Sequence, residues 1–153
     1  MQRERAGFRR GREVMWHSGS PATVRATAEL AKALAHPARI RLLAMLDGGE
    51  LCACQLTAVL GLAPSTVSAH LAGLRRAGLI EEDKRGRWVY SRLTSEPVRA
   101  TLARQLFSLA GDDPQLAEDR ALIAELRRCG PEELCRVGRD LVALGLAAEP
   151  PAG

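Results

Sequence analysis

Aromatic side chains are scarce in this chain of 153 residues, and long apolar runs are missing. Only 3% of the residues are aromatic although 46% are hydrophobic, so Ala and Leu carry most of the apolar content. That composition favours packed helices over a β-sandwich. No run approaches the roughly 20 apolar residues of a membrane span, and no apolar segment follows the Arg-rich N-terminus as it would in a secretory signal. We expect a cytoplasmic protein with one domain and short extensions.

Catalytic groupings are missing as well. The three histidines lie in separate contexts, and neither a Ser/His/Asp or Cys/His grouping nor a glycine-rich phosphate loop is visible. We therefore expect no enzyme. Four cysteines without a secretory signal are more typical of free thiols or metal ligands than of a disulfide framework. The net charge of +4 is compatible with a polyanionic partner.

The spacing of apolar residues, glycine and proline predicts a helix-turn-helix. Residues 1–20 hold five Arg against two Glu without apolar periodicity, which indicates a disordered basic arm that either attracts DNA phosphates or is simply a solvated tail. One helix is expected from about 24 to 35, and a second opens at Pro37 and ends at Gly48. A third helix at about 52–60 and a fourth from Pro64 to about 77 are joined by a short turn containing Gly61.

A small β-hairpin follows this motif. β-Forming residues at 79–80 and 88–93, with Gly86 at the turn, predict its two strands. The predicted fold class is therefore mainly α with a β-hairpin, a winged helix-turn-helix. Apolar periodicity predicts three further helices. The first covers about 97–110, the second includes Leu122, Ile123 and Leu126 and ends at the Gly130-Pro131 break, and the third runs from that break to Leu144. We expect a winged domain at 21–110 whose helical flanks form a homodimer interface, a helical extension at 111–148 and a flexible tail at 149–153.

The fourth predicted helix has the character of a DNA-reading helix. Short polar side chains stand at its start and cations at its end, opposite an apolar stripe of Val67, Leu71 and Leu74. His70 lies at the edge of that stripe, where it either touches DNA or packs half-buried. In the hairpin, cations flank Gly86 and can reach the backbone or an adjacent minor groove. The predicted DNA contacts are Ser65, Thr66, Ser68, His70, Arg75, Arg76, Lys84, Arg85 and Arg87.

A Cys-x-Cys pair stands directly before the helix-turn-helix. On a regular helix Cys52 and Cys54 would point about 200° apart, so they share one ion only if the first turn unwinds. Thiolates select soft or borderline ions such as Cu(I), Zn(II) and their heavier relatives. A ligand that distorts this helix start would move the neighbouring DNA-reading helix and so couple the two sites. The alternative is two small buried hydrophobic side chains.

Residues 24–110 resemble the ArsR/SmtB family of metal-sensing winged-helix repressors. The segments that carry the resemblance are the second-helix entry at 33–43, Glu50-Leu51-Cys52-Ala53-Cys54-Gln55-Leu56, Ser65-Thr66-Val67-Ser68-Ala69-His70-Leu71 and Gly86-Arg87-Trp88-Val89-Tyr90. The second of these is similar to the Glu-Leu-Cys-x-Cys-x-Leu site of arsenic-responsive members. The resemblance implies a homodimer that represses a metalloid-resistance operon from a palindromic double-stranded DNA operator. It also implies that As(III) or Sb(III), the inducer, releases the DNA when it binds the thiols.

The chain departs from the family pattern in ways that bear on the ligand. Thr57 occupies the position where arsenic-responsive members often have a third cysteine. Because trivalent arsenic prefers three sulfurs, we expect Cys129 or Cys135 to complete the site with Cys52 and Cys54. The alternative is that Cys129 and Cys135 only pack between helices. No histidine is present at 97–110, so no zinc or nickel site is expected on that helix. Ala63 and Ala69 replace polar residues common near the reading face, which leaves the operator sequence open.

Two other interpretations remain open. The same DNA-binding domain could respond to Cd(II), Pb(II) or Zn(II) at a site of all four cysteines, or to oxidation of the thiols. A winged helix with inert cysteines and a purely structural or protein-binding role would instead show no salt-dependent affinity for DNA.

Overall fold

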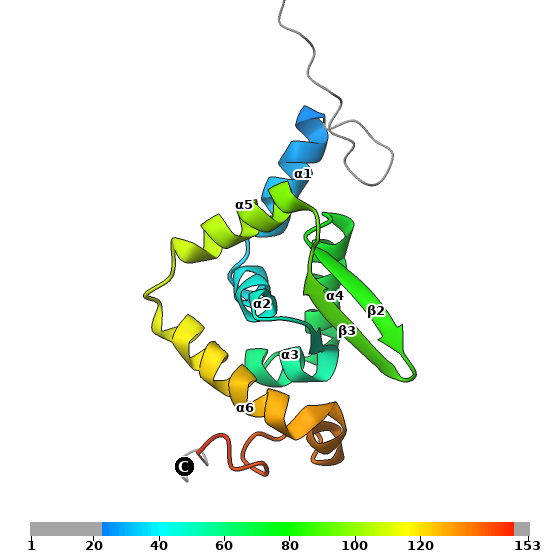
Figure 1. The fold of residues 1–153 in the computed structure, drawn as a ribbon, viewed down its shortest axis with the longest axis vertical. Coiled ribbons are helices and arrows are strands. Elements are labelled where there is room, and N and C mark those ends of the chain that lie inside the picture. Colours follow the sequence, from blue (N-terminus) through cyan, green and yellow to red (C-terminus); the bar gives the residue numbers. More distant parts are fainter. Residues whose placement is uncertain (1–22, 149–153) are drawn as a thin grey trace, which may run out of the picture.

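The structure, a computed structural model, describes residues 23–148 (Figure 1). The predicted basic arm at 1–20 and tail at 149–153 lie outside the described residues. The elements in chain order are α1 Val24–Leu34, α2 Pro37–Asp47, β1 Leu51–Cys52, α3 Ala53–Leu60, α4 Pro64–Arg76, β2 Ile80–Arg85, β3 Trp88–Leu93, α5 Pro97–Ser108 and α6 Pro114–Arg136. The winged helix-turn-helix predicted from the sequence is confirmed.

Proline and a capping side chain open most of the helices. Proline stands in the first turn of α2, α4, α5 and α6, where its missing N–H leaves no hydrogen bond unmade. His36 Nδ1 accepts a hydrogen bond of 3.1 Å from the Ala38 N–H at the start of α2, which gives this histidine a structural role. Glu96 accepts hydrogen bonds of 2.9 Å from the N–H groups of Val98 and Arg99 at the start of α5.

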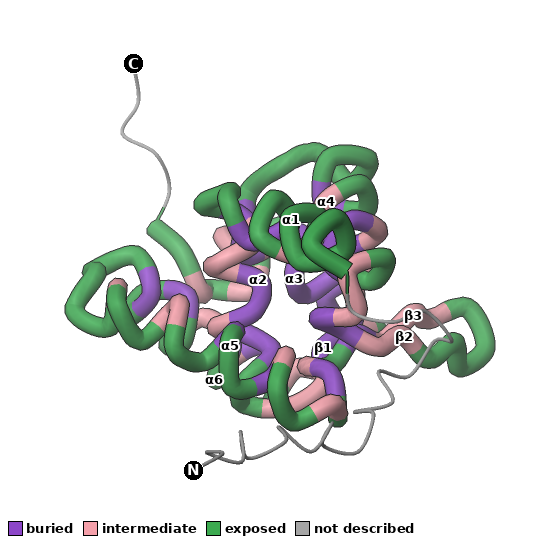
Figure 2. Tube along the Cα trace, turned by 90° about the horizontal axis from the view of Figure 1, so that it is seen from above, coloured by how far each residue is buried: buried purple, intermediate pink, exposed green. Residues whose placement is uncertain are grey.

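The hydrophobic core surrounds α2 and α3. Leu42, Leu43 and Leu56 are fully buried, and Figure 2 shows the buried positions converging on these central helices. The predicted apolar stripe of α4 is confirmed, because Val67, Leu71 and Leu74 are all buried. Taken singly, none of the described helices is both long and apolar enough to cross a membrane; α3 and α4, bent by 115°, meet those criteria only as a pair.

The sheet has three antiparallel strands in the order β1-β3-β2. β2 and β3 form the predicted hairpin, which projects from the helices as the wing (Figure 1), and Gly86 turns it with a φ of 60°. β1 adds a third strand that the sequence did not predict, with Leu51 opposite Ser91 and Cys52 opposite Tyr90. The two residues of β1 therefore join the cysteine segment to the returning strand of the wing.

Helix α6 crosses beneath α2 and α3 (Figure 1). Arg41 of α2 donates two hydrogen bonds of 2.8 Å, from Nε and Nη2, to the buried carboxylate of Asp119. Gly130, at φ 74° and ψ 163°, interrupts α6 at the predicted break. The predicted final helix to Leu144 is wrong beyond Arg136, because Gly138 and Arg139 adopt positive φ and the chain continues in turns.

Candidate nucleic-acid interface and thiol site

The first turns of α4 present the polar side chains expected to read DNA. Ser65, Thr66 and Ser68 are exposed on the face opposite the buried stripe. His70 is half-buried, and its ring centroid lies 4.3 Å from that of His36. Burial lowers the pKa of His70, with the nearby His36 and Arg39 acting in the same direction. His70 is therefore neutral at pH 7 and packs against α2.

The predicted DNA-binding cations divide into two groups. Arg76 and Lys84 are exposed and form no ion pair among the described residues, and Arg87 lies 4.6 Å over the ring of Trp88. Arg75 instead pairs with Glu82, and Arg85 pairs with both Asp83 and Glu50. Glu50 lies two residues before Cys52 and 35 residues from Arg85 in the sequence. Its contact with the wing is formed only by the fold, and the sequence alone did not predict it.

The thiol pair stands at the junction of β1 and α3. Cys52 has extended backbone angles, φ −71° and ψ 147°, and is the N-cap residue, whereas Cys54 belongs to the first turn of α3. The Cys54 thiol donates to Cys52 Sγ across 2.9 Å. The premise that both cysteines lie on a regular helix is therefore wrong. Their sulfurs meet without any unwinding, because the helix begins only at Ala53.

The hydrogen bond between the two sulfurs moves their pKa values apart. The hydrogen bond from Cys54 lowers the pKa of Cys52 to about 6, against the opposing effect of burial, and backbone N–H groups of the first turn of α3 help to stabilise its thiolate. The same hydrogen bond raises the pKa of Cys54, and burial adds to the rise. Of the two sulfurs, Cys52 therefore ionises at the lower pH and is the more nucleophilic.

The two C-terminal thiols both lie on α6. Cys135, half-buried near the end of this helix, adds to the rise in the pKa of Cys54, after the larger effects of Cys52 and burial. Cys129 lies on α6 before the Gly130 break. Within residues 23–148 no group of three or more His, Cys, Asp or Glu is already arranged to hold a metal ion. Three sulfurs would therefore have to draw together around a ligand.

Gln55 is a residue of this site that sequence reasoning missed. Its Oε1 accepts a hydrogen bond of 2.8 Å from the Cys52 N–H, and its Nε2 donates one of 3.1 Å to the Leu126 carbonyl of α6. The side chain is 5% exposed. A glutamine three residues after an N-cap is the pattern of a capping box, which was the available signal. Gln55 ties the cysteine turn to the helix that carries Cys135.

The chain is similar to known bacterial transcriptional regulators. Residues 36–82 match the model of the bacterial regulatory protein arsR family. Over 66 residues the chain is 46% identical to the arsenic resistance transcriptional regulator ArsR1 of Pseudomonas putida, and over 67 residues 40% identical to the arsenical resistance operon repressor of Escherichia coli. The matches cover 42% and 43% of this chain but only 52% and 57% of those relatives. The regulator CmtR of Mycobacterium tuberculosis is 40% identical over 99 residues, which are 63% of this chain and 84% of CmtR.

Solved structures show the same architecture. HlyU from Vibrio cholerae superposes with a TM-score of 0.51 at 35% identity, over 56% of this chain and 91% of that one. The homodimeric winged helix-turn-helix DNA-binding domain of Mb0332 from Mycobacterium bovis gives 0.52 at 27% identity, over 62% and 93%. The relatives named here are transcriptional regulators, which confirms the expectation that the chain is not an enzyme. The chain belongs to the ArsR family of bacterial regulatory proteins.

Proposed function

We propose that this protein is a cytoplasmic, homodimeric repressor of a metalloid-resistance operon that releases its DNA operator when As(III) or Sb(III) binds its thiols. The observation that carries the proposal is the contact of 2.9 Å between the sulfurs of Cys52 and Cys54. This pair opens α3, the helix packed against α4. The names of the Pseudomonas and Escherichia relatives, both tied to arsenic resistance, support the choice of ligand.

The exposed surface of α4 and the wing supports double-stranded DNA as the partner. Hydroxyl side chains at the start of α4 suit base edges and phosphates, and the cations of the wing suit phosphates. Residues 64–93 contain six cationic and three acidic side chains, a net charge of +3. A homodimer, as in the Mb0332 fragment, would place two reading helices on two half-sites and so favour a palindromic operator.

Three thiols of one subunit provide the donors that a trivalent metalloid prefers. We assign Cys52, Cys54 and Cys135 as its ligands, because the first two sulfurs are in contact and Cys135 lies close enough to Cys54 to affect its pKa. Arsenite, As(OH)₃, exchanges its three hydroxides for three sulfurs, and each hydroxide leaves as water with one proton, supplied by a thiol of the site or, for a sulfur that is already a thiolate, by the solvent. No oxidation occurs in this step. Closing three sulfurs on one atom would pull the start of α3 toward α6 and disturb the packing of α3 on α4.

The test measures DNA release. A duplex is selected by the wild type from a randomised pool, and its affinity is measured by fluorescence anisotropy with and without arsenite or antimonite. We expect each metalloid to weaken binding at least tenfold in the wild type. Cys52→Ser, Cys54→Ser and Cys135→Ser should keep the affinity without metalloid and lose the response. Cys129→Ser is the matched control on the same helix and should respond normally.

Different failures point to different parts of the proposal. A wild type that selects no duplex contradicts the DNA-binding function. Normal release in both Cys52→Ser and Cys54→Ser contradicts the sensor site. Normal release in Cys135→Ser alone would transfer the third-ligand role to Cys129 or leave the ligand bound by two sulfurs.

The same sulfur contact favours a second candidate. Two cysteine sulfurs already in contact could also bind Cd(II), Pb(II) or Zn(II), with Cys129 as a fourth thiolate, or be oxidised to a disulfide by a peroxide. Titration of the reduced protein with each ion, followed by ultraviolet thiolate absorbance, separates these inputs. Arsenite should saturate at one equivalent per subunit with three sulfurs bound. Tighter binding of Cd(II), lost in Cys129→Ser, would favour the alternative.

A further inference from the structure

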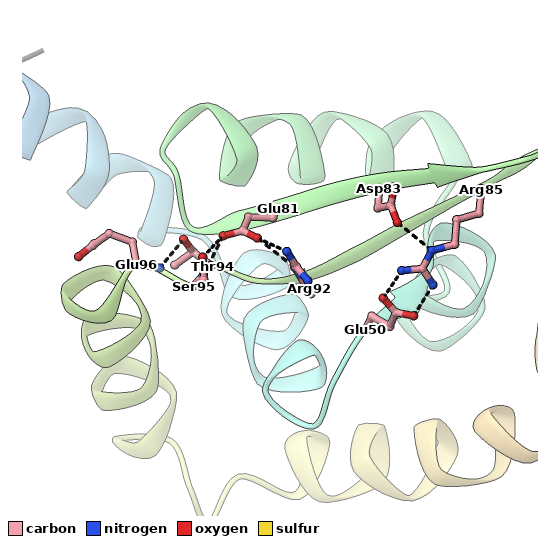
Figure 3. A network of polar contacts seen from close by, with 8 residues as sticks. All are labelled: Glu50, Glu81, Asp83, Arg85, Arg92, Thr94, Ser95 and Glu96. Atoms are coloured by element: carbon pink, nitrogen blue, oxygen red, sulfur yellow. Dashed lines mark hydrogen bonds and ion pairs between the residues drawn. The ribbon is translucent and has the colours of Figure 1, made fainter. Parts of the chain in front are cut away.

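All three guanidinium nitrogens of Arg85, at the tip of the wing, donate hydrogen bonds to carboxylates of the same chain (Figure 3). Its Nη1 and Nη2 donate hydrogen bonds of 2.5 and 2.8 Å to the two carboxylate oxygens of Glu50, and its Nε donates one of 2.8 Å to Asp83. The guanidinium also lies 4.7 Å over the ring of Tyr90. A cation held in this way cannot give the same donors to a DNA phosphate.

The carboxylate that holds Arg85 belongs to the cysteine segment. Glu50 directly precedes β1, and β1 pairs with β3 so that Cys52 lies opposite Tyr90. Successive side chains of an extended segment alternate between faces, so Glu50 and Cys52 share a face. Leu51 and Cys52 are only 1% and 2% exposed, which leaves little freedom for one to move without the other. A restraint on Cys52 is therefore passed to Glu50 over two residues of constrained backbone.

We propose that Glu50 and Arg85 form a latch through which the thiol segment withholds a wing cation from DNA. In the latched state Glu50 holds Arg85; in the DNA-bound state Arg85 leaves Glu50 for a phosphate. A ligand that fixes Cys52 also fixes Glu50 in the latched geometry and so opposes DNA binding. Glu50 thereby acts as a positioning residue for the wing. The inference rests on the proposed function and describes how its two sites communicate.

The strength of the contact suits a switch. The side chains of Arg85 and Glu50 are 49% and 39% exposed, and an ion pair so open to water contributes little to stability. A DNA phosphate can therefore compete for Arg85. Releasing this arginine adds one phosphate contact, which steepens the dependence of log affinity on log salt by about 0.9 per site.

The first experiment is a double-mutant cycle on DNA affinity without any metalloid. Glu50→Gln, Arg85→Gln and the double variant are compared with the wild type on the selected duplex at several salt concentrations. We expect Glu50→Gln to bind DNA about two- to fivefold more tightly, the range of an exposed ion pair, with a steeper salt slope. In the Arg85→Gln background the same change should have almost no effect.

Loss of a negative charge could by itself favour DNA, and the cycle separates that effect from the latch. The matched control is Glu125→Gln, which removes a similarly exposed carboxylate paired with an arginine, Arg128, on α6. A gain from Glu50→Gln that persists when Arg85 is absent, or that Glu125→Gln reproduces, would overturn the latch. Circular dichroism and thermal unfolding establish that each variant is folded.

The second experiment joins the latch to the ligand. With arsenite present, Glu50→Gln should retain DNA about two- to fivefold better than the wild type, whereas its arsenite stoichiometry should not change. If arsenite lowers the DNA affinity of Glu50→Gln by the same factor as that of the wild type, the latch is not coupled to the ligand. Failure of the wild type to bind the duplex or to release it contradicts the proposed function instead. If the effects of Glu50→Gln and Arg85→Gln on DNA affinity are additive while the wild type still releases DNA with arsenite, only the latch is contradicted.

Discussion

Glu81 shows how one carboxylate organises the base of the wing (Figure 3). Its Oε1 accepts hydrogen bonds of 2.6 Å from the Ser95 hydroxyl and 2.8 Å from the Ser95 N–H, and its Oε2 accepts two from Arg92. These contacts, with those from Ser95 the largest, lower the pKa of Glu81 to about 2. The carboxylate thus stabilises the connection between β3 and α5 only while it is ionised.

This network predicts a pH-dependent contribution to stability. A lowered pKa contributes stability that is fully present above the unfolded value of about 4.3 and is lost as the pH falls toward 2. At pH 7 we expect Glu81→Gln to lower the free energy of unfolding by about 1 kcal/mol, a modest value because the side chain is partly exposed. Urea unfolding at pH 7 and pH 3 should show the difference shrinking at the lower pH. Glu132→Gln, an exposed change on α6, should leave stability unaltered at both.

His70 predicts a second loss of stability in acid, which begins at a higher pH than that of Glu81. Its pKa is lowered, chiefly by burial and then by His36 and Arg39, so protonation opposes the native state. The stability conferred by a neutral His70 is complete above the unfolded pKa of about 6.5 and decreases as the pH falls below it. We expect the wild type to lose more stability between pH 7 and pH 5 than His70→Gln. Thermal unfolding across that range measures the two slopes, and equal slopes would contradict this assignment.

Among the elements, α6 depends on polar contacts as well as apolar burial. Asp119 is 2% exposed, and the Arg41 guanidinium that satisfies it also donates to the Val59 carbonyl at 3.3 Å. Removing one partner of such a pair leaves a buried charge unpaired. We expect Asp119→Ala to lower the free energy of unfolding by about 3–5 kcal/mol. Glu118→Ala, next to it on the exposed side of α6, should cost about 0.5 kcal/mol or less.

The loss of stability in Asp119→Ala should be concentrated in α6, because the Arg41–Asp119 ion pair helps to attach α6 to α2 and α3. Amide hydrogen exchange should show faster exchange in α6, and Cys135 should react more readily with a thiol reagent. If Asp119→Ala loosens the wing as much as α6, the ion pair stabilises the domain as a whole and does not specifically dock this helix.

The sequence predicted those elements whose signals are local. Proline and glycine mark the ends of α2 and α4, and the apolar stripe on α4 has helical spacing. β1 could not be found in this way, because two residues are too few to show alternation and their partners lie about forty residues away in β3. The path of α6 rests on Arg41 and Asp119, 78 residues apart. For the same reason the two cysteines were predictable as a pair, but the extended backbone that brings their sulfurs together was not.

At the scale of the whole molecule, α5 leaves an apolar face uncovered. Val98, Leu102 and Leu109 are 52%, 40% and 85% exposed and recur at helical spacing. An exposed stripe of this kind marks an interaction surface, and the winged helix-turn-helix domain of Mb0332, which superposes on this chain, is homodimeric. A second copy of the chain is the occupant that the proposed function requires, because a palindrome is read by two recognition helices.

We therefore expect Leu102→Glu to convert the dimer into a folded monomer. Two unpaired carboxylates would be buried if the interface formed, which costs far more than the apolar contact returns. Leu62→Glu is the matched control, since Leu62 is 38% exposed but lies in the turn between α3 and α4. Analytical ultracentrifugation should give half the wild-type mass for Leu102→Glu and an unchanged mass for Leu62→Glu. A dimeric Leu102→Glu would place the interface elsewhere. A monomer that keeps wild-type affinity for the selected duplex would mean that each subunit reads DNA independently, and the palindromic operator would then have no structural basis.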